Sequence, residues 1–255
     1  EQWSAKLGLI RGNDKVETVL FQTCYVQHNE PQIGKDTLAV LEKNKVDCAC
    51  VKGLRCCGMP AWEQGDLETL RVNAKHNLDI LIPFVEKGSK VLVINPTCSM
   101  MMRREYTELL DGEDRERAKK LSEAVNDPAE YLWNIRNEDR FNTNVNNIPN
   151  ETISYHAPCH LRAQGIGFKG RDLIKKITGS KVKTVMECCG HDGTYAMKVE
   201  GFDASKRIGQ KSFDGMKSEE SEVWVTDCPL AALQFKQHAG VKPKHPMSIL
   251  AEAYR

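Results

Sequence analysis

Cysteine is the residue type whose number and spacing could do chemistry in this chain. Ten cysteines occur in 255 residues, which is well above ordinary usage. Eight of them form two similar patterns, C-x31-C-C-x40-C and C-x28-C-C-x38-C, and a glycine follows each vicinal pair. Matching positions are about 130 to 135 residues apart, a spacing that indicates a duplicated half-domain. The two sets are Cys24, Cys56, Cys57 and Cys98, then Cys159, Cys188, Cys189 and Cys228.

Four thiolates are soft ligands that can hold zinc, copper(I) or an iron–sulfur cluster. In a reducing compartment such spacings indicate metal ligands or redox groups rather than disulfides. Structural zinc sites usually use short C-x2-4-C knuckles, which neither pattern contains, so iron–sulfur clusters are favoured. Vicinal disulfides and a zinc-stabilised assembly scaffold stay as alternatives. Cys48 and Cys50 share one face of an expected strand and are interpreted as buried core residues.

The elements that must position these cysteines alternate between strand and helix. Amphipathic helical patterns at 35–43 and 171–177 separate the first two strands of each half. This order predicts an α/β fold with two pseudo-symmetric parallel-sheet halves from an internal duplication, each carrying one Cys-Cys-Gly motif. Loops at the carboxyl edge of each sheet would gather the cysteines. The predicted strands are 17–21, 46–51 and 91–94, then 151–155, 183–186 and 222–225.

The segment between the two halves has a different composition. It contains charged helical patterns at 113–125 and 129–136 and an Asn-rich stretch at 142–150. We interpret this segment as a connector. The expected domains are a first half at 1–110, the helical and Asn-rich connector at 111–150, and a second half at 151–255.

Charge and hydropathy restrict the classes of partner. Thirty-six Lys and Arg balance thirty-five Asp and Glu to a formal charge of +1, which predicts no nucleic-acid partner.

The longest apolar stretch, 78–85, is interrupted by Asp79 and Pro83 and is too short to span a bilayer, so any membrane contact is expected to be by docking. The first residues lack a signal-peptide pattern, which indicates a cytoplasmic location with peripheral contact at the inner face of the membrane. The G-x-G-x-x-G stretch at 165–170 does not come directly after a predicted strand, so the chain is not expected to bind its own NAD or FAD.

The segments around the cysteines resemble those of the cysteine-rich CCG-domain proteins. The resemblance is strongest to the C subunits of anaerobic glycerol-3-phosphate dehydrogenases. More distant relatives are the B subunits of heterodisulfide reductases and the iron–sulfur subunits of glycolate oxidase and lactate utilisation. The similarity is carried by Cys24-Tyr-Val-Gln-His-Asn-Glu-Pro-Gln-Ile-Gly-Lys-Asp36, Cys56-Cys-Gly-Met-Pro60, Pro96-Thr-Cys-Ser-Met-Met-Met-Arg-Arg-Glu-Tyr106 and Tyr155-His-Ala-Pro-Cys-His160.

This resemblance implies an electron-transfer subunit of an oxidoreductase complex with two [4Fe-4S] clusters, whose ligands are the eight cysteines of the two sets. The subunit would relay electrons from a flavoprotein dehydrogenase subunit towards membrane quinone. A ferredoxin-like iron–sulfur domain or subunit is a further expected partner. The alternative is a heterodisulfide reductase-like catalytic subunit that reduces a disulfide or persulfide between its two clusters.

The cluster geometry stays open because the fullest family pattern has a fifth cysteine in each half. Met101 and Ala231 occupy those positions here. Four thiolates suit a cubane cluster, whereas a vicinal pair also suits a noncubane one. Arg103 and Arg104, which follow Cys98, are expected to be solvated charges on a helix.

Histidines beside the cysteines are the remaining chemical groups. No residue is assigned to catalysis, but His156, His160 and His191 are candidate proton donors, because imidazole titrates near neutral pH. His28 lies similarly close in sequence to Cys24. Quinone or disulfide reduction consumes protons together with electrons, which is the reason to consider them.

Overall fold

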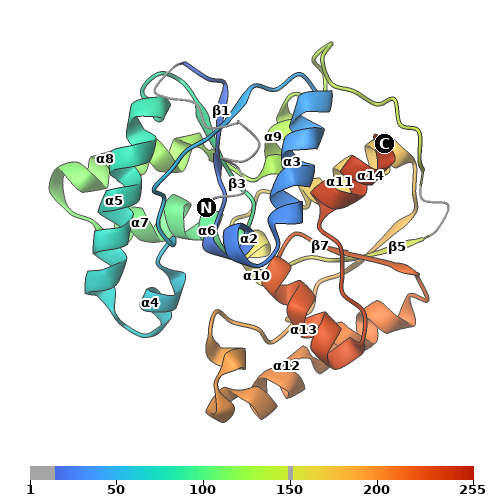
Figure 1. Ribbon diagram of the computed structural model, residues 1–255. Coiled ribbons are helices and arrows are strands. Elements are labelled where there is room, and N and C mark those ends of the chain that lie inside the picture. The colour runs from blue at the N-terminus through green and yellow to red at the C-terminus, as the bar shows by residue number, and fades with distance from the viewer. Residues whose placement is uncertain (1–14, 149–151) are drawn as a thin grey trace. The chain divides into compact units, whose positions relative to one another are not determined.

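The computed structural model describes residues 15–148 and 152–255 (Figure 1). The chain divides into two compact units, Glu1–Phe141 and Asn142–Arg255. Each unit contains a parallel sheet with helices between its strands, which confirms the expected α/β fold class. The domain boundaries expected from the sequence stay a prediction.

The sheet of the first unit has the strand order β2-β1-β3-β4 and is parallel throughout. Thr18 in the central strand β1 pairs with Cys48 on one side and Lys90 on the other. Cys48 and Cys50 are buried, as expected from their shared strand face. The strand β4 was not expected, because two residues are too few to show an alternating pattern. The strands are β1 Thr18–Phe21, β2 Cys48–Cys50, β3 Lys90–Val93 and β4 Val125–Asn126.

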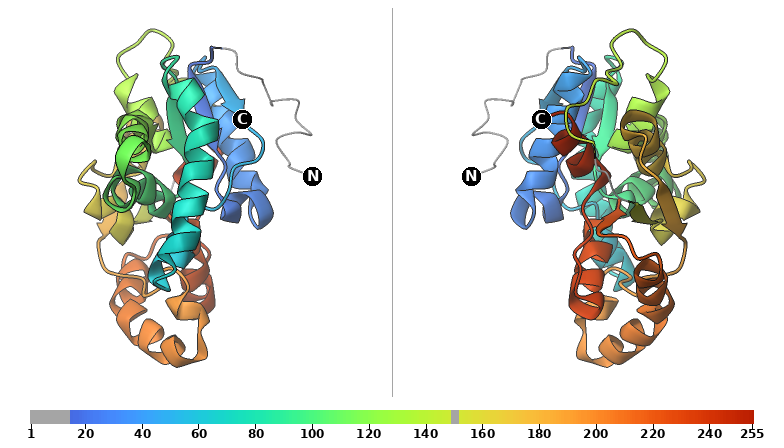
Figure 2. Two further views of the ribbon diagram at one scale, coloured as in Figure 1. Left: turned by 90° about the vertical axis from the view of Figure 1, so that its left-hand side faces the viewer. Right: turned by 90° about the vertical axis from the view of Figure 1, so that its right-hand side faces the viewer.

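Helix α5, Leu67–Val85, carries much of the apolar core of the first unit. Its N-cap Asp66 accepts a hydrogen bond from the Thr69 N–H at 3.1 Å, which satisfies one of the free donors of the first turn. Helix α8 packs against α5, and both lie against β3 (Figure 2). The other helices of this unit are α2 Cys24–His28, α3 Pro31–Lys43, α4 Met59–Glu63, α6 Pro96–Met100, the π-helix η1 Met101–Glu105, α7 Tyr106–Leu109, α8 Gly112–Ala124 and α9 Pro128–Asn134.

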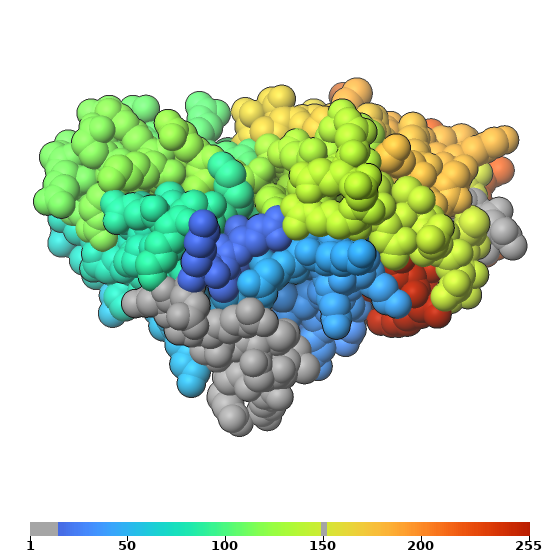
Figure 3. Space-filling view, turned by 90° about the horizontal axis from the view of Figure 1, so that it is seen from above, coloured from blue at the N-terminus to red at the C-terminus, as the bar shows by residue number. Residues whose placement is uncertain are grey.

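The end of the first unit is attached to its sheet by an ion pair. Arg140 donates from Nη2 and Nη1 to the two carboxylate oxygens of Glu17, at 2.6 and 2.8 Å. Arg140 also donates to the carbonyl oxygen of Lys45 at 3.4 Å, and Tyr131 donates to the same Glu17 carboxylate. Figure 3 shows this part of the chain, in yellow-green, beside the blue residues before β1 and β2.

The sheet of the second unit repeats the strand order of the first. Its order is β6-β5-β7, with the first strand of the unit in the centre, as β1 is between β2 and β3. Ile153 pairs in parallel with Val182 and Val223. The strands are β5 Ile153–His156, β6 Val182–Val185 and β7 Val223–Thr226. This shared order is what an internal duplication predicts.

Aromatic packing fills the core of the second unit. The ring of Phe235 on α13 makes edge-on contacts with Phe213 and Trp224, at centroid distances of 5.5 and 5.8 Å. Helix α12 packs on β5 and β6, α13 packs on β7, and α11 packs on α14. The helices are α10 Cys159–Ala163, α11 Lys169–Thr178, the 3-10 helix η2 Tyr195–Met197, α12 Val199–Ser218, α13 Pro229–Ala239 and α14 Pro246–Ala253.

Helices α5 and α12 contain 19 and 20 residues. Both carry charged side chains along their length. In the part of the chain that the structure describes, no helix is long and apolar enough to cross a bilayer.

Candidate metal centre

Each of the four anchor cysteines lies just after the carboxyl end of a strand, where a helix begins. Cys24 and Cys159 are the first residues of α2 and α10. Cys98 lies in the first turn of α6, and Cys228 is the N-cap of α13. The side chain of Thr23 caps α2 by accepting from the N–H of Val26 at 3.3 Å. The strands and caps therefore place these thiols at the carboxyl edges of the two sheets, as predicted.

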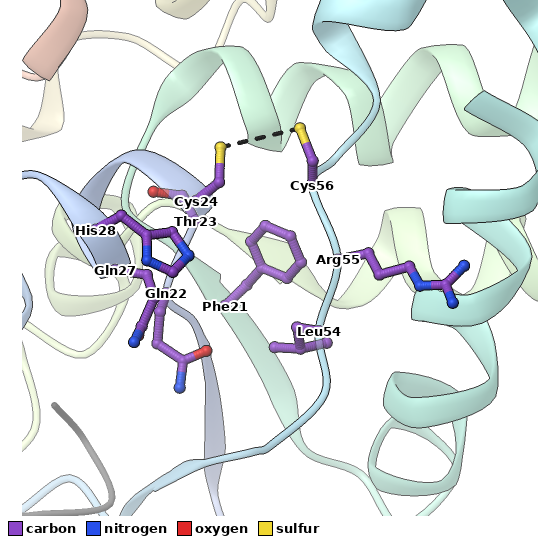
Figure 4. A pocket seen from close by; sticks show the side chains of 9 residues that line it. All are labelled: Phe21, Gln22, Thr23, Cys24, Gln27, His28, Leu54, Arg55 and Cys56. Atoms are coloured by element: carbon purple, nitrogen blue, oxygen red, sulfur yellow. Dashed lines mark hydrogen bonds between the residues drawn. The ribbon is translucent and has the colours of Figure 1, made fainter. Parts of the chain in front are cut away.

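The first cysteine set gathers in the first unit. The Sγ atoms of Cys24 and Cys56 lie 3.9 Å apart (Figure 4). The Cys57 thiol lies close enough to the thiols of both Cys56 and Cys98 for each of them to raise its pKa. Cys57 and Cys98 are buried, whereas Cys24 is exposed. The four thiols thus form one chain of contacts from the core to the surface.

These thiols cannot all be ionised without a compensating positive charge. Hydrogen bonds from the thiols of Cys24 and Cys57 lower the pKa of Cys56 to about 3. The hydrogen bond to Cys56 and burial raise the pKa of Cys24, and hydrogen bonds with Cys56 and Cys98 raise that of Cys57. A bound metal group deprotonates its thiol ligands and offsets their mutual repulsion. The donor set therefore fits a thiolate-bound metal centre.

Side chains from two helices hold the first Cys-Cys-Gly turn. Asn77 accepts from the N–H of Arg55 at 2.9 Å and donates to the carbonyl oxygen of Arg55 at 3.3 Å. The buried phenol of Tyr106 donates to the carbonyl oxygen of Cys57 at 3.0 Å. Sequence reasoning assigned no role to either residue, because Asn77 lies outside every motif, Tyr106 is only the last residue of the family segment 96–106, and both contacts join distant parts of the chain.

A pocket of about 140 Å³ adjoins the Cys24–Cys56 pair (Figure 4). Neither Cys57 nor Cys98 lines it, so it lies beside the thiol set rather than within it. Its lining residues are Phe21, Gln22, Thr23, Cys24, Gln27, His28, Leu54, Arg55 and Cys56. His28 gives the pocket an imidazole group beside the two thiols, whereas the Arg55 side chain points away from them (Figure 4).

The second cysteine set gathers in the second unit. The thiols of Cys159 and Cys188 are hydrogen-bonded to each other, while Cys189 and Cys228 are buried. The hydrogen bond from Cys159, aided by the Gly190 N–H at 3.3 Å, lowers the pKa of Cys188 to about 6. Burial raises the pKa of Cys189 to about 12. This set has the same progression from buried to accessible thiols as the first.

The second Cys-Cys-Gly turn is held between α12 and α13. Gly190 has φ +76°, and a Cβ there would overlap the carbonyl oxygen of Ser205. The Ser205 hydroxyl donates to the carbonyl oxygen of Gly190 at 2.6 Å. Gln234 donates to the Ser205 hydroxyl at 2.7 Å and to the Cys189 carbonyl oxygen at 3.5 Å. Sequence reasoning identified the glycine but missed Ser205 and Gln234.

The three candidate histidines have different surroundings. His156 is buried, with Nδ1 3.1 Å from the Thr226 hydroxyl and Nε2 3.0 Å from the carbonyl oxygen of Glu187. Because a carbonyl only accepts, Nε2 carries the proton and the ring joins β5, β7 and the second turn. Burial lowers the pKa of His156 and of His191 to about 4, and it also lowers that of His160. Their role as proton donors stays a prediction.

Arg103 is not a solvated helix charge, contrary to the expectation. Its guanidinium forms an ion pair with Glu130 and donates to the carbonyl oxygen of Val125 at 2.8 Å. Its side chain is only 13% exposed. The partner lies 27 residues away, so no local pattern could have indicated the pair.

The positions of the family's fifth cysteine are both buried. Met101 packs in the same apolar core as Cys57 and Cys98, whereas Ala231 offers only its backbone N–H, 3.4 Å from the Cys228 sulfur. Among residues 15–148 and 152–255, no group of three or more His, Cys, Asp or Glu side chains is arranged to hold a single metal ion.

Two segments of the chain, residues 18–103 and 153–236, match the family of the cysteine-rich domain CCG. Each segment contains one of the two cysteine sets, and together they cover more than half of the chain. The chain therefore belongs to the CCG cysteine-rich domain family.

The chain is also similar to two named proteins. It is 27% identical over 254 residues to the C subunit of the anaerobic glycerol-3-phosphate dehydrogenase of Escherichia coli K12, covering 99% of this chain and 63% of that protein. It is 27% identical over 186 residues to lactate utilization protein A 2 of Bacillus cereus AH820, covering 71% of this chain and 74% of that protein. The chain thus spans less than two thirds of the glycerol-3-phosphate dehydrogenase component that it matches.

Proposed function

We propose that this chain is an iron–sulfur electron-transfer subunit of an oxidoreductase complex, with one four-iron cluster in each unit. The observation that carries the proposal is the repeated gathering of four thiols at the carboxyl edge of a parallel sheet. Four thiolates match an iron–sulfur cluster in number and softness. The proposed ligands are Cys24, Cys56, Cys57 and Cys98 in one unit and Cys159, Cys188, Cys189 and Cys228 in the other.

Within each unit the cysteines would have different tasks. An iron–sulfur cluster supplies reversible one-electron transfer. The buried Cys57 and Cys189 would anchor it in a medium of low dielectric constant, while the exposed Cys24 and Cys159 would form the accessible edge for electron exchange. Backbone N–H groups that donate to cysteine sulfur, such as that of Gly190 on Cys188, stabilise added negative charge and so tune the potential.

The relatives suggest the partners. Because they are named as a subunit of a glycerol-3-phosphate dehydrogenase and as lactate utilization proteins, we assign substrate oxidation to a flavoprotein dehydrogenase subunit. Electrons would then pass through this chain towards membrane quinone, with a ferredoxin-like iron–sulfur domain or subunit as a further carrier. The proposed location is cytoplasmic, with peripheral contact at the inner face of the membrane.

Metal analysis of anaerobically purified and reconstituted chain tests the proposal. We expect about eight irons and a similar amount of acid-labile sulfide, in line with two four-iron clusters. Electron paramagnetic resonance (EPR) of the dithionite-reduced protein would also distinguish cubane from noncubane geometry. The chain alone should show no turnover with glycerol 3-phosphate, lactate or glycolate. Zinc as the only bound metal, or a single cluster after reconstitution, would contradict the proposal.

A disulfide or persulfide reductase is the second candidate function, favoured by the pocket beside Cys24 and Cys56. A small thiol-derived substrate could approach the first cysteine set there. The test is reduction of small disulfides by purified chain with an artificial reductant. Catalytic turnover that Cys56→Ser abolishes would replace the relay function with this one, whereas cluster reduction without turnover supports the relay.

A further inference from the structure

His191 has a buried nitrogen that no other group of the described residues satisfies. The residue is 7% exposed, and its Nε2 has no hydrogen-bond partner in the part of the chain that the structure describes. Buried polar atoms are almost always paired, and an unpaired one requires an explanation such as an ion that is bound in the working protein. Burying an imidazole nitrogen without a hydrogen-bond partner costs free energy, and a bond from that nitrogen to a metal would offset this cost.

The position of His191 points to the second cysteine set as the source of that bond. His191 is the second residue after Cys189, and its backbone N–H donates to the Cys189 thiol. Its side chain interacts electrostatically with His160, which directly follows Cys159. The residue with the unpaired nitrogen therefore belongs to the turn that carries Cys188 and Cys189, and it interacts with the residue next to Cys159.

His191 can be compared with another histidine near the second cysteine set and with the residue at the matching position of the first unit. His156 also lies near the second set, but both of its ring nitrogens have partners. In the first unit the residue that follows Cys-Cys-Gly is Met59, which is 3% exposed and packs in the apolar core. The cysteines are thus the same in the two turns, whereas the position after Cys-Cys-Gly holds an apolar side chain in the first unit and a buried histidine in the second.

We infer that Nε2 of His191 is a nitrogen ligand of the cluster that Cys159, Cys188, Cys189 and Cys228 hold. This inference rests on the proposed function and specifies the ligand set of the second unit. Neutral imidazole is a common metal ligand, and histidine joins cysteine at some iron–sulfur centres. The second unit then offers five donors and the first offers four thiolates, so the two clusters are chemically inequivalent.

Pulsed EPR of the reduced, reconstituted full chain tests this ligation directly. Protein is prepared with histidine labelled with either ¹⁴N or ¹⁵N, and Cys57→Ser protein isolates the signal of the second cluster. We expect a strong nitrogen hyperfine coupling that changes with the label. His191→Met, which copies Met59, should keep the second cluster and lose this coupling. His160→Asn is the matched control and should keep the coupling.

Three results would overturn the inference. They are a cluster with no label-sensitive coupling, a coupling as weak as that of a hydrogen-bonded nitrogen, and a coupling lost in His160→Asn but kept in His191→Met. If His191→Met fails to assemble its second cluster, the labelled unaltered chain still decides the question. His191→Cys provides a second variant, which should keep the iron of the second cluster and lose the nitrogen hyperfine coupling. Absence of iron from the second unit would refute the proposed function, whereas a cluster without nitrogen coupling refutes only this ligand.

Discussion

The phenol of Tyr106 donates a hydrogen bond to the carbonyl oxygen of Cys57, and both groups are buried. In the second unit, Gln234 donates to the carbonyl oxygen of Cys189, the matching residue of the other Cys-Cys-Gly turn. Each donor follows the last cysteine of its set by less than three helical turns. Each unit therefore uses a side chain from its third cysteine segment to hold the backbone of its second.

Tyr106→Phe removes this hydrogen bond and leaves the Cys57 carbonyl without that donor. We expect a loss of about 1–3 kcal/mol in the free energy of unfolding and weaker iron retention in the first unit alone. Urea unfolding and iron analysis measure the two effects. Tyr195→Phe, at a residue that is 41% exposed, should leave both unchanged. Equal effects of the two substitutions would show that the Tyr106 hydroxyl has no special role.

Cys57→Ser and Cys189→Ser should each remove about four irons and leave the other cluster in place, because a four-iron cluster is held by one set and the sets lie in separate units. Iron content and EPR of the folded variants measure the loss. Cys50→Ala changes a buried cysteine outside both sets and should keep all the iron. A folded variant that lacks both clusters would show that the eight thiols are divided differently.

Gly190→Ala should destabilise the second unit strongly. The substitution combines a left-handed φ of +76° with overlap on the Ser205 carbonyl oxygen. We expect a cost of roughly 3 kcal/mol or more and loss of the second cluster. Gly179→Ala is a matched control, since its φ is +72° and no atom lies within 4 Å of the added Cβ. That variant should lose only about 1 kcal/mol, and similar losses in the two variants would contradict the packing argument.

Glu17→Gln should reduce stability in a pH-dependent way. Burial alone would raise the pKa of Glu17, but hydrogen bonds from Arg140 and Tyr131 outweigh it and lower the pKa. Such a carboxylate stabilises the fold above its unfolded pKa, and the contribution disappears as pH falls through the lower folded pKa.

The expected cost of Glu17→Gln is therefore about 1 kcal/mol at neutral pH and nearly zero once the pH is well below the lowered folded pKa. Urea unfolding of both proteins across this pH range measures the difference. Glu138→Gln removes another, more exposed partner of Arg140 and should change stability by less than about 0.5 kcal/mol. If the loss of stability caused by Glu17→Gln instead grew as the pH falls, the pKa of Glu17 would be raised by folding and not lowered, and the prediction would be wrong.

Cysteine spacing and strand patterns were sufficient to predict the α/β fold and the two thiol sets. The reason is geometric, since parallel strands bring the residues that follow them to one edge of the sheet. Cys24 and Cys56 are separated by 31 residues, yet they meet because β1 and β2 are neighbours. Element ends differ by a few residues, as for the strand predicted at 46–51 and observed at Cys48–Cys50.

The sequence by itself therefore determined the duplication and which cysteines each sheet gathers, because these follow from local periodicity and spacing, while the family followed from the resemblance of the segments around the cysteines. The folded chain decided which side chains support them. Asn77, Tyr106 and Gln234 reach the Cys-Cys-Gly turns over 21 to 49 residues of chain. Their hydrogen bonds, and the unpaired nitrogen of His191, depend on which groups become buried together in three dimensions, and local sequence patterns carry no record of that.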